Sequence, residues 1–326
     1  MNTSRVKLSI CIPTYNRAIY LKQSLESILI AISDFQNEVE IVISDNASSD
    51  ATQEMVSENL NKYPFIRYHR NSTNIGGEMN FRFVATLARG NYIWIFGDDD
   101  LMLPDAIDIV LRRINKNFNI IVCNYPLWSN DFGTLLRERM LPIRTSMILN
   151  DHNDVLKIIG LRLGFISMVI IRRDIYLSLP LPEYESYAEY GFPFLYAVYS
   201  GIFNQCHAYI ETTPVLMQRG GQTDTCVNKD WWYKCFVIGS SLIFDKLKDK
   251  GYARTSVQHA KYLVLKDDVT TDLINRRLNG IEIVGIFSLL LTKYKSQWYF
   301  WIVLVPVIYL PLSILKRARR FFGKNH

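Results

Sequence analysis

Short apolar runs and helical periods alternate over the first 125 residues of the chain. Between the runs, apolar residues recur every three or four positions, which is the spacing of one face of a helix. The strand-like runs are 7–12, 39–44, 66–70, 92–96 and 120–123. This β-α-β-α order predicts an α/β fold in which a mostly parallel sheet is flanked by helices. In such sheets ligands bind at the carboxyl ends of the strands.

The alternation becomes less regular after Tyr125. The stretch 298–315 contains no charged residue, and the tail 316–326 contains five basic residues and no acidic one. Further strands are expected at 167–171, 206–210 and 215–218, and further helices at 189–200, 229–250 and 256–279. Residues 226–326 are therefore predicted to form a helical C-terminal region.

Three consecutive carboxylates, Asp98, Asp99 and Asp100, come shortly after the apolar run 92–96. Such a cluster at the tip of a buried strand is costly unless a positive group meets it. The hard cations Mg²⁺ and Mn²⁺ prefer carboxylate oxygens and often bind through substrate phosphates as well. The cluster therefore predicts a metal-bound nucleotide at the carboxyl edge of the sheet. The alternative is a solvated turn in which Asp99 or Asp100 caps the helix that starts near Pro104.

Composition narrows the class of protein. A hydrophobic content of 49% with 21% charged residues is typical of a globular chain. The net charge is +6, but five of the positive charges lie in the last eleven residues, so no nucleic-acid-binding face is expected. No G-x-G-x-x-G follows the first strand, which disfavours a dinucleotide-dependent dehydrogenase.

The five cysteines include no C-x-x-C pair, so a thiolate zinc site is not expected. Cys11 and Cys123 lie within apolar runs and are expected to be reduced core residues. The apolar stretch 8–12 is too short for a signal peptide and ends at Pro13. These observations favour a reducing, cytosolic setting.

Four motifs match a known family in their order and in the elements that carry them. They are Ser9–Arg17, Ile43–Thr52, Asn74–Gly76 and Gly97–Asp100. Together they resemble the family 2 glycosyltransferases, and the sequence before the acids looks most like the abequosyltransferases of bacterial O-antigen assembly. The resemblance implies a Rossmann-like GT-A fold, a nucleotide-sugar donor, a divalent metal (Mn²⁺ or Mg²⁺) and inversion at the anomeric carbon.

The same resemblance implies a division of the chain. A GT-A catalytic domain is expected at 1–225, with a nucleotide-sugar-binding half at 1–125 and an acceptor-binding half at 126–225. The helical region 226–326 follows this domain and carries the uncharged stretch and the basic tail.

The resemblance also implies roles for individual residues. Asp45 matches the aspartate that accepts a hydrogen bond from the nucleotide base, a role that suits an ionised carboxylate; the alternative is that it only ends a strand. Arg17 can bind a phosphate through two hydrogen bonds, and Arg219 matches a position that meets the donor diphosphate. The full set expected at the nucleotide sugar is Pro13, Thr14, Tyr15, Arg17, Asp45, Asn74, Asp98 and Arg219.

Metal binding is expected at Asp99 and Asp100, which match the second acid of the family's metal motif and the acid after it. Gly97 stands where the family has its first acid, and Asp98 is displaced by one position. Which carboxylate touches the metal directly therefore stays open. The task of the metal would be to neutralise the diphosphate leaving group.

An inverting transferase needs a carboxylate that removes the proton of the acceptor hydroxyl. The family often has Glu-Asp at the start of a helix, and this chain has Glu189 followed by Tyr190. Glu189 is therefore the candidate catalytic base, with Glu185 and Glu183 as alternatives. A surface glutamate at a helix start needs no catalytic function.

The uncharged stretch 298–315 is at the lower length limit for a membrane-spanning helix, which needs roughly 20 residues. Pro306 and Pro311 disfavour a straight helix, although membrane helices tolerate proline. Trp298 and Trp301 resemble an interfacial belt, and the basic tail fits a cytosolic side. The stretch is predicted to be membrane-associated, as a spanning, re-entrant or peripheral segment. The alternative is a buried core helix.

These expectations combine into one function. The chain is expected to move a sugar, such as the dideoxyhexose abequose, from a nucleotide diphosphate to a lipid-linked oligosaccharide at the cytoplasmic face of the bacterial inner membrane. The expected partners are the two substrates and membrane lipid. The Q-x-x-R-W signature of processive synthases is absent, so one sugar per encounter is expected. The alternatives are transfer to a polyprenyl phosphate and a non-catalytic sugar-nucleotide-binding scaffold.

Overall fold

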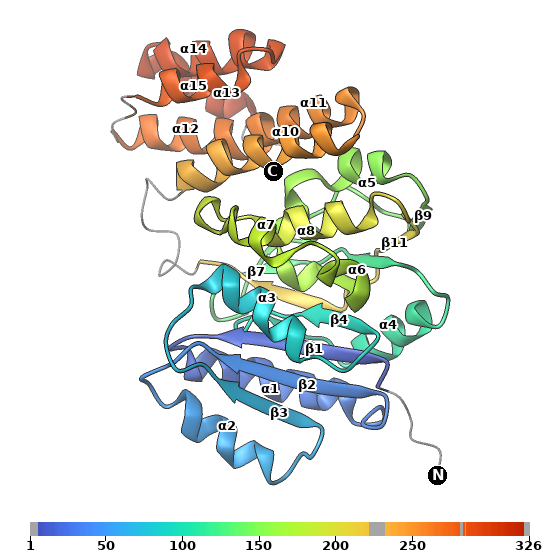
Figure 1. Ribbon diagram of the computed structural model, residues 1–326. Helices are drawn as coiled ribbons and strands as arrows, with labels where there is room; N and C mark the ends of the chain where they lie inside the picture. Colours follow the sequence, from blue (N-terminus) through green and yellow to red (C-terminus); the bar gives the residue numbers. More distant parts are fainter. Residues whose placement is uncertain (1–5, 222–231, 281–282, 284, 323–326) are drawn as a thin grey trace.

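A large mixed sheet lies at the centre of the molecule (Figure 1). The computed structural model describes residues 6–221, 232–280, 283 and 285–322. Among these residues the main sheet has the strand order β3-β2-β1-β4-β10-β6-β11-β9. The strands of this sheet are β1 (Leu8–Thr14), β2 (Val39–Asp45), β3 (Ile66–Arg70), β4 (Tyr92–Ile95), β6 (Ile120–Cys123), β9 (Met147–Leu149), β10 (Val169–Arg172) and β11 (Ala208–Glu211).

A smaller sheet has the order β5-β12-β7-β8 among the described residues. Its strands are β5 (Leu101–Met102), β7 (Leu127–Trp128), β8 (Leu135–Arg137) and β12 (Leu216–Arg219). β5 follows the acidic triplet directly, and β12 pairs with both β5 and β7. The smaller sheet therefore joins the acidic triplet to the second half of the chain.

The first four strands of the main sheet are parallel, as the sequence predicts. β1 pairs in parallel with β2 and β4, and β2 pairs in parallel with β3. Every residue of β1 and β2 is buried, as expected for strands covered by helices on both faces. Thr14 and Asp45 are register partners at the ends of β1 and β2, so the polar segments after these strands share one edge of the sheet.

The strand β10 departs from the predicted mostly parallel sheet. It lies between β4 and β6 and runs antiparallel to both. β6 then pairs in parallel with β11, and β9 at the edge is antiparallel. The prediction is therefore right for the first half of the sheet and wrong for the second half, which is mixed. A buried apolar run fits either direction, so its pattern alone could not decide the orientation of β10.

Helices cover both faces of the main sheet (Figure 1). α3 packs on β1 and β2 and also contacts α6 and α8. α1 lies on the opposite face, where it contacts α2 and α4. The α-helices of this part are α1 (Ala18–Ile32), α2 (Thr52–Leu60), α3 (Gly77–Leu87), α4 (Ala106–Ile114), α5 (His152–Ile159), α6 (Arg173–Leu177), α7 (Leu181–Glu185) and α8 (Pro193–Ile202). The 3₁₀ helices are η1 (Gly160–Gly164), η2 (Ile166–Met168) and η3 (Ala188–Tyr190).

The described residues after 231 are helical, as the sequence predicts, and they form a layer against α5 and α8. α10 packs on α8, and α11 packs on α5. An ion pair between Arg162 and Asp267 also joins the two parts. The helices of this layer are η4 (Lys234–Gly239), α10 (Ser240–Lys250), α11 (Arg254–Leu263), η5 (Val264–Val269), α12 (Thr270–Leu278), α13 (Ile286–Tyr294), η6 (Phe300–Leu304), α14 (Val305–Tyr309) and α15 (Leu312–Phe322), of which η4, η5 and η6 are π-helical. The predicted boundary at 225/226 lies outside the described residues.

The stretch 298–315 is helical but broken. Leu310, which precedes Pro311, has an extended backbone (ψ 145°) that separates α14 from α15, because a residue before proline is disfavoured in the helical region. No helix formed by the described residues is long and apolar enough to cross a membrane. Phe300 is fully buried whereas Trp301 is 49% exposed, so the stretch is partly core and partly an apolar surface. Lys324 of the basic tail lies outside the described residues.

Candidate active site

A cavity of about 320 Å³ lies at the carboxyl ends of β1, β2 and β4. This is the edge where ligands bind in parallel α/β sheets. Among the described residues that line it, Arg17 is the one cation. The lining residues are Pro13, Thr14, Tyr15, Arg17, Asn46, Asn74, Gly77, Asn80, Phe81, Gly97, Asp98, Asp99, Asp100, Phe165 and Ile166. The structure therefore brings together eight of the ten residues predicted to bind the nucleotide sugar or the metal.

The three carboxylates of the acidic triplet have different surroundings. Asp98 is buried and accepts a 2.7 Å hydrogen bond from the Thr14 hydroxyl. The guanidinium of Arg17 lies 3.3 Å from Asp98 Oδ1 and 2.9 Å from Asp99 Oδ2. Asp100 is buried and accepts hydrogen bonds from the hydroxyl of Ser167 (2.6 Å) and from the backbone N–H of Arg219 (3.2 Å).

Gly97 is required by the way these carboxylates fold back onto the turn. A Cβ atom at position 97 would lie 2.9 Å from Asp100 Oδ2 and 3.0 Å from Asp99 Oδ1. An aspartate at this position, as the family usually has, would collide with both. The glycine at this position therefore fits the way in which the acids pack here. The alternative of a helix cap at Asp99 or Asp100 finds no support, because the cap residue of α4 is Asp105.

Burial controls the ionisation of the two inner acids. It raises the pKa of Asp98 to about 7, although Arg17 acts in the opposite direction. Burial also raises the pKa of Asp100 well above its usual range, and the neighbouring charge of Asp99 adds to the effect, while the Ser167 hydrogen bond opposes it. Desolvation disfavours the charged form of a carboxylate, and a cation bound nearby would favour that form again.

The residues of the triplet fit a hard divalent cation that is held partly by phosphate oxygens. Asp99 lies on the cavity wall with 22% of its side chain exposed, whereas Asp98 and Asp100 are held by protein donors. No group of three or more His, Cys, Asp or Glu side chains within the described part of the chain is arranged to hold a metal ion. A cation bound through one or two carboxylates plus substrate phosphates is the usual arrangement for Mg²⁺, and Asp99 is the residue placed to provide the first of these.

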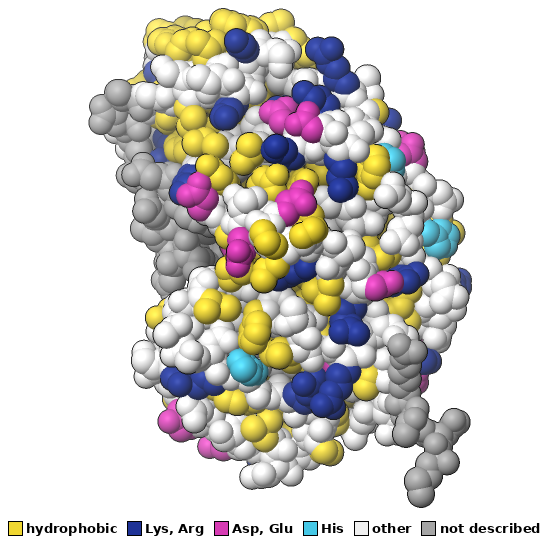
Figure 2. Space-filling model, viewed as in Figure 1, with side chains coloured by type: hydrophobic (Ala, Val, Ile, Leu, Met, Phe, Trp, Pro, Cys, Tyr) yellow, Lys and Arg dark blue, Asp and Glu magenta, His cyan; other side chains and the backbone are white. Residues whose placement is uncertain are grey.

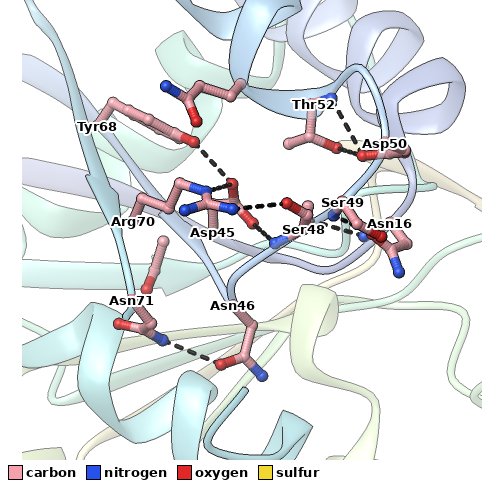
Figure 3. A network of polar contacts seen from close by, with 12 residues as sticks. Asn16, Asp45, Asn46, Ser48, Ser49, Asp50, Thr52, Tyr68, Arg70 and Asn71 are labelled. Carbon is pink, nitrogen blue, oxygen red and sulfur yellow. Dashed lines mark hydrogen bonds and ion pairs between the residues drawn. The ribbon is translucent and has the colours of Figure 1, made fainter. Parts of the chain in front are cut away.

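The turn after β1 supplies part of the cavity wall beside the acids. Asn16 adopts a left-handed backbone (φ 53°), which asparagine tolerates well, and its side chain accepts a hydrogen bond from the backbone of Ser49 (2.7 Å). Asp50 accepts hydrogen bonds from the backbone N–H groups of Ala18 and Thr52, so it binds the starts of both α1 and α2. The turns after β1 and β2 are therefore held in one rigid unit (Figure 3).

Asp45 lies at the centre of the network in Figure 3 and is fully buried. Its carboxylate accepts hydrogen bonds from the hydroxyl of Tyr68 (2.7 Å) and the backbone N–H of Ser48 (2.8 Å), and Arg70 Nε lies 3.5 Å away. Asp45 is not among the residues that line the cavity. The residue does end a strand, and its predicted bond to a nucleotide base stays a prediction.

Two asparagines next to Asp45 reach the cavity. Asn46 donates to Asn74 Oδ1 (2.8 Å) and accepts from the backbone of Ile75 (3.0 Å). Asn80, on α3, donates to the backbone carbonyl of Ser44 (2.9 Å). Asn74 was predicted at this site, whereas Asn46 and Asn80 were not, although Asn46 stands inside a motif that signalled the family.

Arg219 lies beneath the acidic triplet rather than on the cavity wall, and it is 8% exposed. Its guanidinium donates hydrogen bonds to the backbone carbonyls of Asp99 (2.9 Å) and Asn130 and to Gln23 Oε1 (2.6 Å). In this conformation Arg219 holds the turn of the triplet in place. Its predicted contact with the donor diphosphate would require these bonds to break.

The candidate base and its alternatives lie outside the cavity lining. Glu189 is exposed, and its carboxylate lies 3.7 Å from Lys234 Nζ. A hydrogen bond with Tyr190 and the charge of Lys234 lower the pKa of Glu189, which weakens it as a base. Glu183 accepts a hydrogen bond from the Tyr196 hydroxyl (2.8 Å), and Glu185 is exposed. The identity of the base stays a prediction.

Three residues from the second half of the chain complete the site without having been predicted. Phe165 and Ile166 form part of the cavity wall. Ser167 is fully buried, donates to Asp100 and accepts a 2.8 Å hydrogen bond from the backbone N–H of Gly97. Sequence reasoning had no signal for Ser167, because a single serine before an apolar run is common in cores as well as in sites.

Comparison with known proteins shows what the chain is similar to. The chain is 32% identical over 225 residues to the abequosyltransferase RfbV of Salmonella typhimurium (strain LT2), which covers 65% of this chain and 66% of that protein. It is 31% identical over 122 residues to an uncharacterized protein of Mycobacterium bovis, over 35% of the length of that relative.

Solved structures share the fold at low sequence identity. S. aureus TarS 1–349 in complex with UDP-GlcNAc has a TM-score of 0.63 at 13% identity and covers 98% of this chain and 93% of that one. The mannosyltransferase PcManGT of Pyrobaculum calidifontis, in complex with GDP-Man and Mn²⁺, has a TM-score of 0.57 at 13% identity, over 98% and 88% of the two chains. The family model described as glycosyl transferase family 2 matches residues 9–179, which is more than half of the chain, and the protein therefore belongs to this family.

Proposed function

We propose that the protein transfers a sugar from a nucleoside diphosphate donor to a lipid-linked oligosaccharide, with inversion at the anomeric carbon. The observation that carries the proposal is the cavity at the ends of β1, β2 and β4, where Arg17 and Asp99 face each other across 2.9 Å. This pairing offers one group for phosphate and one for a cation. The resemblance to the Salmonella abequosyltransferase supports a dideoxyhexose such as abequose as the sugar.

The proposed cofactor is Mn²⁺ or Mg²⁺, bound by Asp99 together with the phosphates of the donor. Such a cation neutralises the charge that develops on the diphosphate leaving group. Tyr15 is 45% exposed at the cavity and offers a ring face to the base or ribose. Thr14 fixes the orientation of Asp98 by its hydrogen bond, and the Ser167 bond does the same for Asp100.

The proposed location is the cytoplasmic face of the bacterial inner membrane, and the proposed attachment is by an apolar surface that lies flat on the lipid. Figure 2 shows hydrophobic side chains gathered at the end of the molecule where α14 lies. Lys316 and Arg317 are exposed beside this surface on α15. The exposed apolar residues of the stretch 298–315 are Trp298, Trp301, Ile302, Tyr309, Leu312 and Ile314. Aromatic rings with neighbouring basic residues are typical of segments that bind the interface of anionic membranes.

Transfer is tested by a screen of nucleotide sugars for metal-dependent thermal stabilisation, followed by an assay of transfer to lipid-linked oligosaccharide with the sugar that stabilises. Asp99→Asn should abolish transfer and metal-dependent stabilisation, because the amide keeps the shape of the side chain but loses its charge. Transfer to polyprenyl phosphate alone would favour that acceptor instead. Donor binding without any transfer would favour a non-catalytic scaffold.

Attachment is tested by flotation with vesicles of phosphatidylglycerol and phosphatidylcholine. Trp301→Ser combined with Ile302→Ser should weaken binding to both. Lys316→Gln with Arg317→Gln should weaken only binding to the anionic vesicles, by about 1 kcal/mol per charge at low salt. Ile30→Ser, at an exposed apolar position on α1, is the matched control and should leave binding unchanged. Unchanged flotation of the first variant would refute this surface.

A further inference from the structure

A second cavity lies in the helical C-terminal layer, between α11 and residues 296–298, which connect α13 to η6. Its volume is about 700 Å³, which is within the range of small-molecule sites. Arg254 and His259 line this cavity, and among its described lining residues there is no aspartate or glutamate. It shares no lining residue with the candidate active site, so its polar groups serve a different purpose.

The edge of this cavity is suited to an anion. Arg254 is exposed there, and no described acid forms an ion pair with it. α11 begins at the same residue, and its cap residue, Ala253, forms no side-chain cap hydrogen bond. The first backbone N–H groups of a helix have no partner within the helix. These groups and the guanidinium therefore offer several donors to one phosphate.

Two glutamine side chains in the cavity wall are suited to hydroxyl groups. Gln297 is 4% exposed, and its Nε2 donates to the backbone carbonyl (3.0 Å) and to the side-chain Oε1 of Gln258. A backbone carbonyl can only accept, so this contact fixes the orientation of the Gln297 amide. No described residue donates to Gln297 Oε1, and Gln258 Nε2 is left as a donor. A buried acceptor beside a donor matches a hydroxyl, which accepts and donates.

The same cavity adjoins the proposed membrane-binding surface. Trp298 lines the cavity, is 59% exposed and stacks on the ring of Tyr262 at 5.9 Å. Trp301, on the same surface, donates through Nε1 to the backbone carbonyl of Lys295 (2.9 Å), directly before the cavity-lining segment 296–298. α11 also lies at the same end of the molecule as α13, α14 and α15 (Figure 1). A ligand with a polar head in the cavity would thus have an apolar surface beside it.

We propose that this cavity binds the phosphoglycerol headgroup of one anionic glycerophospholipid. The phosphate binds Arg254 and the first turn of α11, and the glycerol hydroxyls bind the amides of Gln258 and Gln297. Choline and ethanolamine headgroups fit less well, because their ammonium groups would enter a cavity that has a cation and no acid among its described lining residues.

This proposal rests on the membrane attachment proposed above and adds specificity to it. Attachment by an apolar surface and scattered basic residues depends on the charge of the lipid and is insensitive to the chemistry of its headgroup. A cavity that binds the headgroup distinguishes lipids of equal charge. It also fixes how the protein is oriented on the membrane, because one point of the surface is tied to one lipid.

The test compares flotation with phosphatidylcholine vesicles that contain equal fractions of phosphatidylglycerol or of phosphatidylserine, two lipids of the same net charge. The wild type should bind the phosphatidylglycerol vesicles about tenfold more tightly, as expected for the loss of one or two hydrogen bonds to buried groups. Equal binding to the two kinds of vesicle would overturn the proposal.

Variants then locate the preference. Gln297→Leu removes the free acceptor and Arg254→Gln removes the phosphate ligand, so each should bring the ratio of the two affinities close to one. Lys266→Gln is the matched control, because it removes an exposed positive charge of the same helical layer outside the cavity lining and should leave the ratio unchanged. Thermal unfolding shows whether each variant is folded. If the buried change Gln297→Leu does not fold, the exposed Arg254→Gln decides.

Soluble competitors separate the lipid headgroup from free phosphate. Glycerophosphoglycerol, which has the headgroup without the acyl chains, should release the wild type from phosphatidylglycerol vesicles. Inorganic phosphate at the same concentration should release much less. Equal release by the two compounds would overturn the assignment to a lipid, since the cavity would then recognise phosphate alone.

Failure of the proposed membrane attachment gives a different result. The wild type would then float with no vesicle of any composition. Ligand-observed nuclear magnetic resonance with glycerophosphoglycerol would still test the cavity by itself. Binding to the wild type and not to Arg254→Gln would support the headgroup site, and no binding to the wild type would overturn it.

Discussion

Ser167 provides the sharpest test of how the acidic triplet is held. Its hydroxyl donates to Asp100 at 2.6 Å and accepts from the backbone N–H of Gly97 at 2.8 Å, and the side chain is fully buried. Ser167→Ala removes both bonds at once and leaves a partly buried N–H and a buried carboxylate each with one partner fewer. An unsatisfied buried group costs about 1–3 kcal/mol, and slightly more when it is charged.

The expected loss in the free energy of unfolding is therefore about 3 kcal/mol for Ser167→Ala, measured by urea denaturation. Ser241→Ala is the matched control, because Ser241 is equally buried but its hydroxyl has no hydrogen-bond partner among the described residues. That change should cost less than about 1 kcal/mol. Equal losses in the two variants would refute the reasoning, since they would show that the hydroxyl contributes by packing alone.

Three further predictions follow from other contacts. Burial raises the pKa of Glu78 to about 8, so its ionisation opposes folding and the free energy of unfolding should fall as pH rises from about 5 to 8. In urea denaturation, Glu78→Gln should make this fall with pH less steep. An equally steep fall in Glu78→Gln and the wild type would contradict the prediction. A Cβ atom at Gly239 would collide with the backbone carbonyl of Tyr190, so Gly239→Ala should lower the free energy of unfolding by about 1–3 kcal/mol. At Gly77 a Cβ atom would meet nothing within 4 Å, so Gly77→Ala is the control and should not lower it. Glu189→Gln should lower turnover in the transfer assay with little change in donor affinity; turnover near the wild-type value would shift the search for the base to Glu183 or Glu185.

The strands and the first turn could be predicted because their signals are local. The run 92–96 is apolar throughout, and β4 forms there. The motif residues after β1 and β4 meet because parallel strands place their carboxyl ends at one edge. Thr14 therefore reaches Asp98 across 84 positions of sequence, as expected from the topology.

The remaining parts of the site depend on contacts that no local pattern encodes. Ser167 binds Asp100 only because β10 is inserted beside β4, and strand insertion depends on the energy of the whole sheet. Arg219 matches a family position, but one of its carbonyl partners lies in the loop at Asn130, which carries no recognisable pattern. The exposed face of 298–315 could not be predicted either, because composition does not tell which side chains pack inward.

The insertion of β10 between β4 and β6 has a consequence for how the protein is made. A growing chain that has completed only its first 125 residues contains β4 with one edge unpaired and β6 without either neighbour. An open apolar edge is prone to pair with other chains. Residues 169–172 close the gap between β4 and β6, and the second edge of β6 stays open until residues 208–211 have left the ribosome. A fragment ending at residue 125 is therefore expected to aggregate instead of binding nucleotide.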